Sequence, residues 1–239
     1  MVVRALIVPP GGSTVLRRRD HGSFVLIHST FSLTALTDFG DLAVLLPLAA
    51  FVLIWLSWRS AKWNAVWWGL ALGLCIGTTA LLKAYFFACP VSSELHSPSG
   101  HASLSTLVYG GLGTIIVAGR AGWRRSAAIT VVAALIFAIG ASRIALDAHT
   151  WVEVALGLLI GLASLALFAY PYLRLQAGPA PLKAFLLAAL SLAFLFHGDK
   201  LRAEEFLHRL SGYAHLRSIA CPVMVHRASA SVVGSTSAR

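Results

Sequence analysis

The chain has 239 residues, of which 58% are hydrophobic and 12% are charged. Soluble domains carry about 25% charged residues, and a soluble fold of this length could not bury so much apolar surface. Intrinsic disorder is excluded by the same composition, because disordered chains are polar. The net charge of +10 comes from basic residues scattered between apolar runs, which argues against nucleic-acid binding. The composition therefore predicts a polytopic membrane protein.

Six apolar segments approach the roughly 20 residues that a helix needs to cross a bilayer. Their ranges are 42–56, 63–82, 104–119, 126–145, 150–170 and 182–196. Each run is continuously apolar and does not alternate with period two, unlike the strands of a membrane barrel. We expect an all-α, polytopic transmembrane bundle of about six spans. Glycines within the spans should let neighbouring helices approach closely; they include Gly69, Gly73, Gly77, Gly111 and Gly113.

The segments on either side of these spans have a different composition. Residues 1–41 form an N-terminal segment without the long apolar core of a signal peptide. Within it, the apolar stretch 24–36 is short for a span, which favours an interfacial or re-entrant segment over a crossing. Residues 199–239 form a polar tail, with a short amphipathic helix expected around 201–210. Residues 42–198 should then form one transmembrane domain.

The loops between the spans divide the basic residues unequally. Two of the nine Lys and Arg residues between positions 42 and 197, Lys83 and Arg143, fall in the second and fourth loops. The other seven fall in the first, third and fifth loops: Arg59, Lys62, Arg120, Arg124, Arg125, Arg174 and Lys183. The face with seven cations should be cytoplasmic, so the second and fourth loops should face the periplasm or the exterior. The basic run 17–19 would then lie outside unless residues 24–36 also cross, and the sequence leaves this open.

Tryptophans gather around the first loop, where an interfacial belt is the expected arrangement. They are Trp55, Trp58, Trp63, Trp67 and Trp68.

Polar residues from distant parts of the chain are expected to meet at the outer face. Lys83 ends the second span, and Pro98-Ser99-Gly100-His101 opens the third. Ser142-Arg143, five residues, His149, three residues and Glu153 follow at the junction of the fourth and fifth spans. The 41 residues from His101 to Ser142 are enough for two crossings and a short turn. This spacing returns the second group to the face where the first one lies.

Half of this set is suited to binding a phosphate group. Lys83 and Arg143 supply cationic donors, and the arginine fork fits phosphate oxygens. The Ser99 hydroxyl and the amides of Gly100 and His101 lie at a helix start, where unpaired N–H groups favour an anion.

The other half is suited to nucleophilic catalysis. His149 and Glu153 are four residues apart on one helix face, so the carboxylate can hold one imidazole nitrogen and leave the other to attack. His101 can protonate the departing oxygen, because an imidazole ordinarily titrates near about pH 6.5.

These motifs resemble the superfamily of type 2 phosphatidic acid phosphatases and vanadium haloperoxidases, in its membrane-bound lipid phosphatase branch. The family pattern is Lys-x6-Arg-Pro, then Pro-Ser-Gly-His, then Ser-Arg-x5-His-x3-Asp. This chain matches the second block fully and the third with Glu153 in place of Asp. After Lys83 the family arginine is missing, and the proline, Pro90, comes one position early. His96 is the nearest residue that could substitute for that arginine.

The resemblance assigns a role to each residue. It implies that His149 forms a phosphohistidine intermediate, that His101 is the general acid and that Glu153 orients His149. It also implies that the phosphate is held by Lys83, Ser99, Gly100 and Arg143, with Ser142 as a further candidate. Loss of one guanidinium could weaken transition-state binding by several kcal/mol if nothing replaces it.

Each part of the pattern also has a structural interpretation. Pro-Ser-Gly makes an ordinary turn before a helix, and Lys83 could extend to the membrane surface at the end of a span. Arg143 with Asp147, or His149 with Glu153, could be a simple ion pair along a helix. The conjunction of spacing, order and membrane side favours a functional site, and an ionisable residue inside an apolar run is usually functional.

The leading hypothesis is an integral membrane phosphatase of the cell (inner) membrane, which hydrolyses a lipid phosphate monoester or pyrophosphate at the outer face. No metal is expected, because the sequence has no cluster of paired carboxylates and Cys75, Cys89 and Cys221 lack metal-ligand spacing. A catalytically silent relative that binds or moves phospholipid is the alternative, motivated by the missing arginine. Vanadium haloperoxidase activity is a third hypothesis, which an apolar, membrane-embedded chain disfavours. The lipid head group and the oligomeric state stay open.

Overall fold

The computed structural model describes residues 33–59, 62–88, 97–175 and 182–198. A short helical stretch at residues 33–38 precedes six longer helices. These are α2 (Leu42–Arg59), α3 (Lys62–Ala88), α4 (Gly100–Val117), α5 (Trp123–Ala145), α6 (Trp151–Leu175) and α7 (Leu182–Leu195). Each corresponds to one of the six expected segments, and no residue within the described ranges is in a strand. The prediction of an all-α bundle is confirmed.

Within the described residues, four helices are long and apolar enough to cross a membrane. They span residues Leu33–Arg59, Lys62–Phe87, Trp123–Ala145 and Trp151–Arg174, while the apolar part of α7 is shorter. Of the expected interfacial segment 24–36, only residues 33–36 are described, and they begin the short helical stretch before α2. The expected helix at 201–210 lies outside the described residues.

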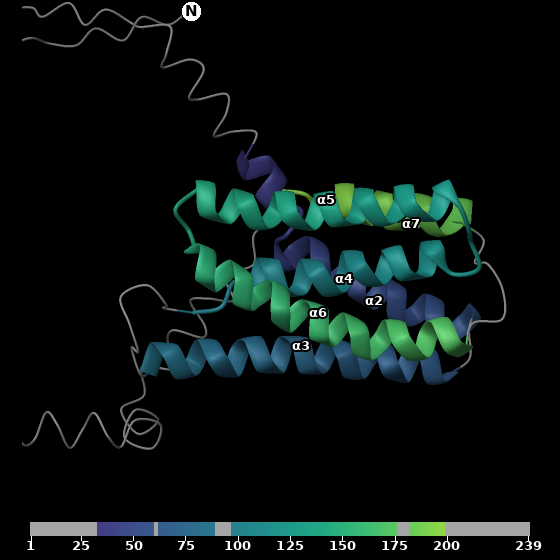
Figure 1. Ribbon diagram of the computed structural model, residues 1–239, viewed down its shortest axis with the longest axis horizontal. Coiled ribbons are helices and arrows are strands. Elements are labelled where there is room, and N and C mark those ends of the chain that lie inside the picture. The colour runs from purple at the N-terminus through teal and green to yellow at the C-terminus, as the bar shows by residue number, and fades with distance from the viewer. Residues whose placement is uncertain (1–32, 60–61, 89–96, 176–181, 199–239) are drawn as a thin grey trace, which may run out of the picture.

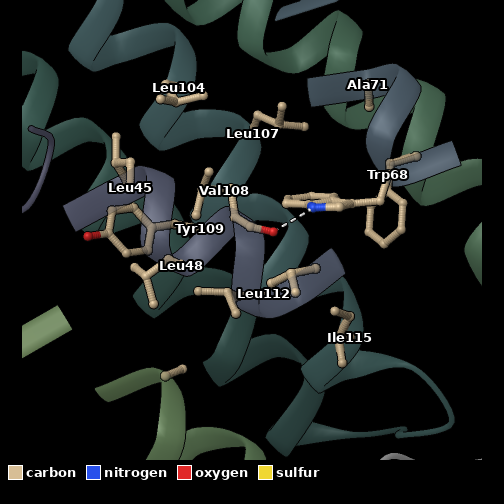
Figure 2. Packing of buried hydrophobic residues seen from close by; sticks show 14 of the residues in the cluster. Leu45, Leu48, Trp68, Ala71, Leu104, Leu107, Val108, Tyr109, Leu112 and Ile115 are labelled. Carbon is tan, nitrogen blue, oxygen red and sulfur yellow. Dashed lines mark hydrogen bonds between the residues drawn. The ribbon is translucent and has the colours of Figure 1, made fainter. Parts of the chain in front are cut away.

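Helix α4 forms the centre of the bundle. It runs between α5 on one side and α3 on the other, and it also packs against α2 and α6 (Figure 1). Nearly all of its side chains are buried, polar ones included. Figure 2 shows leucines of α4 packed with Leu45 and Leu48 of α2 and with Trp68 of α3. A fully enclosed α4 gives its N-terminus a fixed position at one end of the bundle.

Two glycines of α6 bring that helix directly against α4. A Cβ atom at Gly157 would lie 2.5 Å from the carbonyl oxygen of Ser99, and one at Gly161 would lie 2.5 Å from that of Ser103. Only a residue without a side chain allows this approach. The start of α4 and the start of α6 are therefore held in contact.

The glycines of α3 do not play the expected role. Around Gly69, Gly73 and Gly77 a Cβ atom would meet no atom within 4 Å, so these residues face away from the neighbouring helices. Close approach occurs on α4 instead, where a Cβ at Gly111 would lie 2.4 Å from the Trp68 ring. The sequence could not distinguish the packed glycines from the outward ones, because both groups lie in apolar helices.

The tryptophans near the first loop also divide into two kinds. Trp58 and Trp63 are 82% and 68% exposed, as an interfacial belt requires. Trp68 is fully buried, packs edge-on against Phe168 and donates its indole N–H to the Ala49 carbonyl at 3.0 Å. The belt prediction is wrong for Trp68, because this ring fills the space above Gly111 in the core.

Candidate active site

The polar residues singled out in the sequence are on or beside the ends of α3 and α5 and the starts of α4 and α6. These four helix ends lie together at one end of the bundle, on the left in Figure 1. Lys83 is near the end of α3, and Gly100 and His101 begin α4. Ser142 and Arg143 are in the last turn of α5, and His149 precedes α6, which holds Glu153 in its first turn. The expected return of the second group to the face of the first is therefore present in the fold.

A tight turn places His149 beside the end of α5. The backbone N–H groups of Ala148 and His149 both donate to the carbonyl oxygen of Arg143, at 3.0 and 3.2 Å. Asp147 adopts a left-handed conformation with φ of 52°, which reverses the chain direction. The five residues between Arg143 and His149 thus form one reversal of the chain direction.

Glu153 holds the imidazole of His149. Its Oε2 atom lies 2.7 Å from Nδ1 of His149, and both side chains are almost fully buried. With Glu153 ionised, Nδ1 carries the proton and Nε2 carries the lone pair. The imidazole is therefore in the tautomer that a nitrogen nucleophile requires.

Glu153 also takes part in the N-terminal capping of α6, together with Thr150. Its Oε2 accepts a hydrogen bond from the Thr150 N–H at 3.2 Å, and Oγ1 of Thr150 accepts one from the Glu153 N–H at 3.3 Å. This reciprocal pair is a capping box, which favours Glu at the third helical position. Its other oxygen, Oε1, accepts from the Ser97 N–H at 2.9 Å. The longer glutamate side chain, where the family has Asp, thereby joins the imidazole of His149 to the backbone of Thr150 and of Ser97.

The loop before α4 is fixed against α6 as well. Ser99 caps α4 by accepting a hydrogen bond from the Ala102 N–H, and its own N–H donates to the Glu153 carbonyl at 3.0 Å. The first turn of α4 has N–H groups with no intrahelical acceptor, which makes this end of the helix suitable for an anion.

Lys83 and Arg143 surround this region with positive charge. Lys83 is only 4% exposed, and its Cε atom lies 3.7 Å from the position of a Cβ on Gly100. A lysine extended to the membrane surface would expose its ammonium group, so the surface interpretation of Lys83 does not fit. Both cations act electrostatically on His149.

Burial is the main reason that the pKa of His149 is lowered from its ordinary value. The positive charges of Lys83 and Arg143 lower it further, while the hydrogen bond and charge of Glu153 oppose the change. The result is an imidazole that stays neutral near pH 7 and has its Nε2 lone pair available.

Ser142 is buried, and its hydroxyl donates to the Ile139 carbonyl at 2.7 Å and also contacts the Thr37 hydroxyl. His96 and Cys89 lie outside the described residues. Within the described ranges, no group of three or more His, Cys, Asp and Glu residues could hold a metal ion.

Asp41 is the residue that the sequence analysis missed. Its Oδ2 atom lies 3.7 Å from Nε2 of His101, and it precedes α2 as an N-cap. The motif Gly-Asp before an apolar run does indicate a helix start. Contact with a residue 60 positions further along the chain depends on tertiary packing and has no signal in the sequence.

Comparison with known proteins supports the resemblance stated from the motifs. Residues 80–176 match the PAP2 superfamily, which confirms the family similarity. An uncharacterized 22.5 kDa protein in the cps region of Klebsiella pneumoniae is 34% identical over 134 residues. That alignment covers 54% of this chain and 64% of the relative's length. No solved structure gives a significant match.

Proposed function

We propose that the protein is an integral membrane phosphatase that hydrolyses a lipid phosphate monoester or pyrophosphate through a phosphohistidine on His149. The observation that carries this proposal is the contact of 2.7 Å between Nδ1 of His149 and Glu153. It fixes the nucleophilic tautomer beside Lys83 and Arg143, two cations that suit a phosphate group. The PAP2 similarity of residues 80–176 supports the same class of reaction.

In the first step, Nε2 of His149 attacks phosphorus, a P–N bond forms and the P–O bond to the leaving group breaks. His101 gives its proton to the leaving oxygen, so the product departs as a neutral alcohol or a protonated phosphate. Lys83, Arg143, Ser99 and the N–H of Gly100 hold the phosphoryl oxygens as negative charge develops on them. Glu153 stabilises the positive imidazolium that results from attack.

In the second step, a water molecule attacks the phosphohistidine. His101, now neutral, takes a proton from that water, the P–N bond breaks and inorganic phosphate leaves. His149 recovers its Nε2 lone pair and His101 recovers its proton, so both residues return to their starting states. The hydroxyl of Ser142, in the last turn of α5, contacts the hydroxyl of Thr37.

A lipid substrate is favoured by the setting of the site. The helices that bear it are apolar and largely exposed on their outer faces, as membrane spans are. The charge asymmetry favours the periplasmic or exterior side of the cell membrane for the site end. A lipid phosphate can reach a site at the end of membrane-spanning helices without leaving the membrane.

The test uses the full-length protein purified in detergent and a panel of lipid phosphates, with release of inorganic phosphate as the readout. We expect turnover by the wild type, inhibition by vanadate and no effect of a chelator. His149→Ala should abolish turnover, and Asp147→Asn is the matched control. Asp147 is an exposed residue in the same turn, and Asn adopts its left-handed conformation readily. Turnover retained in His149→Ala would contradict the nucleophile assignment.

A catalytically silent protein that binds or moves phospholipid is the second candidate, because the arginine of the first family block is absent after Lys83. Binding of lipid phosphate across the panel without phosphate release by the wild type would favour it. Halide oxidation after loading with vanadate would favour a haloperoxidase instead.

A further inference from the structure

The segment that precedes α2 contacts two residues of the proposed active site, Ser142 and His101. Residues 33–41, here termed the N-terminal strap, lie outside the part of the chain that matches the PAP2 superfamily. Three contacts fix the strap: the Thr37 hydroxyl with Ser142 of α5, the Phe39 carbonyl with the Tyr109 hydroxyl of α4 at 2.7 Å, and the Ala35 carbonyl with Nε2 of His197 after α7 at 2.9 Å. The strap is therefore an ordered wall of the site end.

The last two residues of the strap face the imidazole of His101. Gly40 lies so close that a Cβ atom there would be 3.2 Å from Cδ2 of His101 and 2.6 Å from a methyl carbon of Ile139. Asp41 presents Oδ2 to Nε2 of His101 at 3.7 Å, and the two side chains are 12% and 19% exposed. The imidazole is thus in contact with the strap along one edge.

The Asp41 carboxylate is held in this position by its second oxygen. Oδ1 accepts a hydrogen bond from the Ala43 N–H at 2.9 Å and so caps the N-terminus of α2. The cap fixes the side-chain rotamer, and Oδ2 is then directed toward α4. A carboxylate fixed beside an imidazole favours the protonated imidazolium over the neutral ring.

We propose that Asp41 is a positioning residue for the general acid His101, and that the N-terminal strap is part of the catalytic unit. The inference rests on the proposed phosphatase function. In the step that breaks the P–O bond, Asp41 stabilises the imidazolium that donates the proton; in the hydrolytic step it stabilises the same imidazolium as it forms again. The charge of Asp41 therefore promotes proton transfer by His101. The hydrogen bond of its other oxygen stabilises the N-terminus of α2.

Two substitutions separate the charge from the cap. Asp41→Asn removes the charge and keeps a good N-cap, whereas Asp41→Glu keeps the charge and weakens the cap. We expect kcat to fall about tenfold in Asp41→Asn, a share of the 10²–10⁴-fold that general acid–base catalysis contributes, with little change in KM. Asp41→Glu should retain more activity but melt at a lower temperature. A purely structural role for Asp41 predicts the opposite order of activities.

The leaving group supplies a readout that altered folding would not produce. An alkyl phosphate needs a proton on its departing oxygen, whereas p-nitrophenyl phosphate releases a stable phenolate without one. Asp41→Asn and His101→Ala should both slow the alkyl substrate several times more than the nitrophenyl substrate. Asp147→Asn is the control, because it removes an exposed carboxylate from the same end of the bundle.

The outcomes distinguish the two proposals. Equal losses on both substrates in Asp41→Asn, or no loss at all, would overturn the role of Asp41 while an active wild type leaves the phosphatase proposal intact. A wild type that releases no phosphate from any substrate, with binding retained, would overturn the phosphatase proposal and the inference with it.

Discussion

The two ends of the bundle carry charge in opposite ways. All four acidic residues of the described ranges, Asp38, Asp41, Asp147 and Glu153, are at the site end, together with only two cations. The opposite end has seven cations and, within the described ranges, no acidic residue. There, Arg59, Arg124 and Arg174 lie over aromatic rings at 5.1 to 5.8 Å.

The difference shows that position, more than residue type, decides what a cation does in this fold. Lys83 is buried beside Gly100 and acts on His149. Arg124 is exposed and lies over Trp123, which is 76% exposed, as a residue at a membrane surface does. Substitutions at the site end should therefore change chemistry, and substitutions at the opposite end should leave it unchanged.

The largest effect is expected from the carboxylate of the site end. Glu153→Gln keeps the shape of the side chain but removes the charge that holds Nδ1–H of His149, so the wrong tautomer becomes accessible. We expect kcat to fall by up to about 10⁴-fold, the loss seen when the orienting carboxylate of a catalytic triad is replaced by its amide. Steady-state kinetics on the best lipid phosphate would measure it. A loss below about tenfold would show that Glu153 serves mainly as the cap of α6.

The next largest loss of kcat is expected from replacing a cation at the site end, compared with replacing one at the opposite end. Lys83→Met should lower kcat about 10²-fold, because one buried donor to the developing phosphoryl charge is lost. Arg124→Met, the matched change at the opposite end, should alter kcat less than twofold, a margin that follows from its distance from the site. Both variants would be assayed in parallel. Equal losses of kcat would contradict the prediction that Lys83 acts in the chemistry and Arg124 does not.

A smaller loss of kcat is expected at Gly40, and Gly73 provides the matched control. Gly40→Ala forces Ile139 or the imidazole of His101 to move, and we expect kcat to fall about tenfold. The double variant Gly40→Ala, Ile139→Ala should recover part of the activity, because the nearest obstructing methyl group is gone. Gly73→Ala meets no atom within 4 Å and should behave as the wild type. Full activity in Gly40→Ala would show that the strap does not constrain His101.

The smallest expected effect is a shift in a titration. Burial and the two cations lower the pKa of His149, so its midpoint should lie below the ordinary value of about 6.5. NMR of protein labelled at histidine would follow the midpoint, with His149→Ala identifying the resonance. In Lys83→Met the midpoint should rise, because a neighbouring positive charge is removed. A midpoint above the ordinary value in the wild type would contradict the charge arrangement.

The sequence predicted the helices and the convergence of the motifs because both depend on simple periodic quantities. Apolar run length determined the six helices, and the separation of 41 positions between His101 and Ser142 determined which end they share. Contacts that depend on side-chain packing were not predictable. The burial of Trp68 over Gly111, the outward direction of Gly73 and the contact of Asp41 with His101 all depend on how the helices are rotated.

In the proposed mechanism, His149 carries the phosphoryl group between the two steps. The most direct test is a rapid mix of the purified protein with lipid phosphate, an alkaline quench that preserves phosphohistidine, and mass spectrometry of the peptides. We expect a phosphoryl group on His149 in the wild type and none in His149→Ala. A phosphoryl group on another residue, or turnover with no labelled peptide and full activity in His149→Ala, would contradict it.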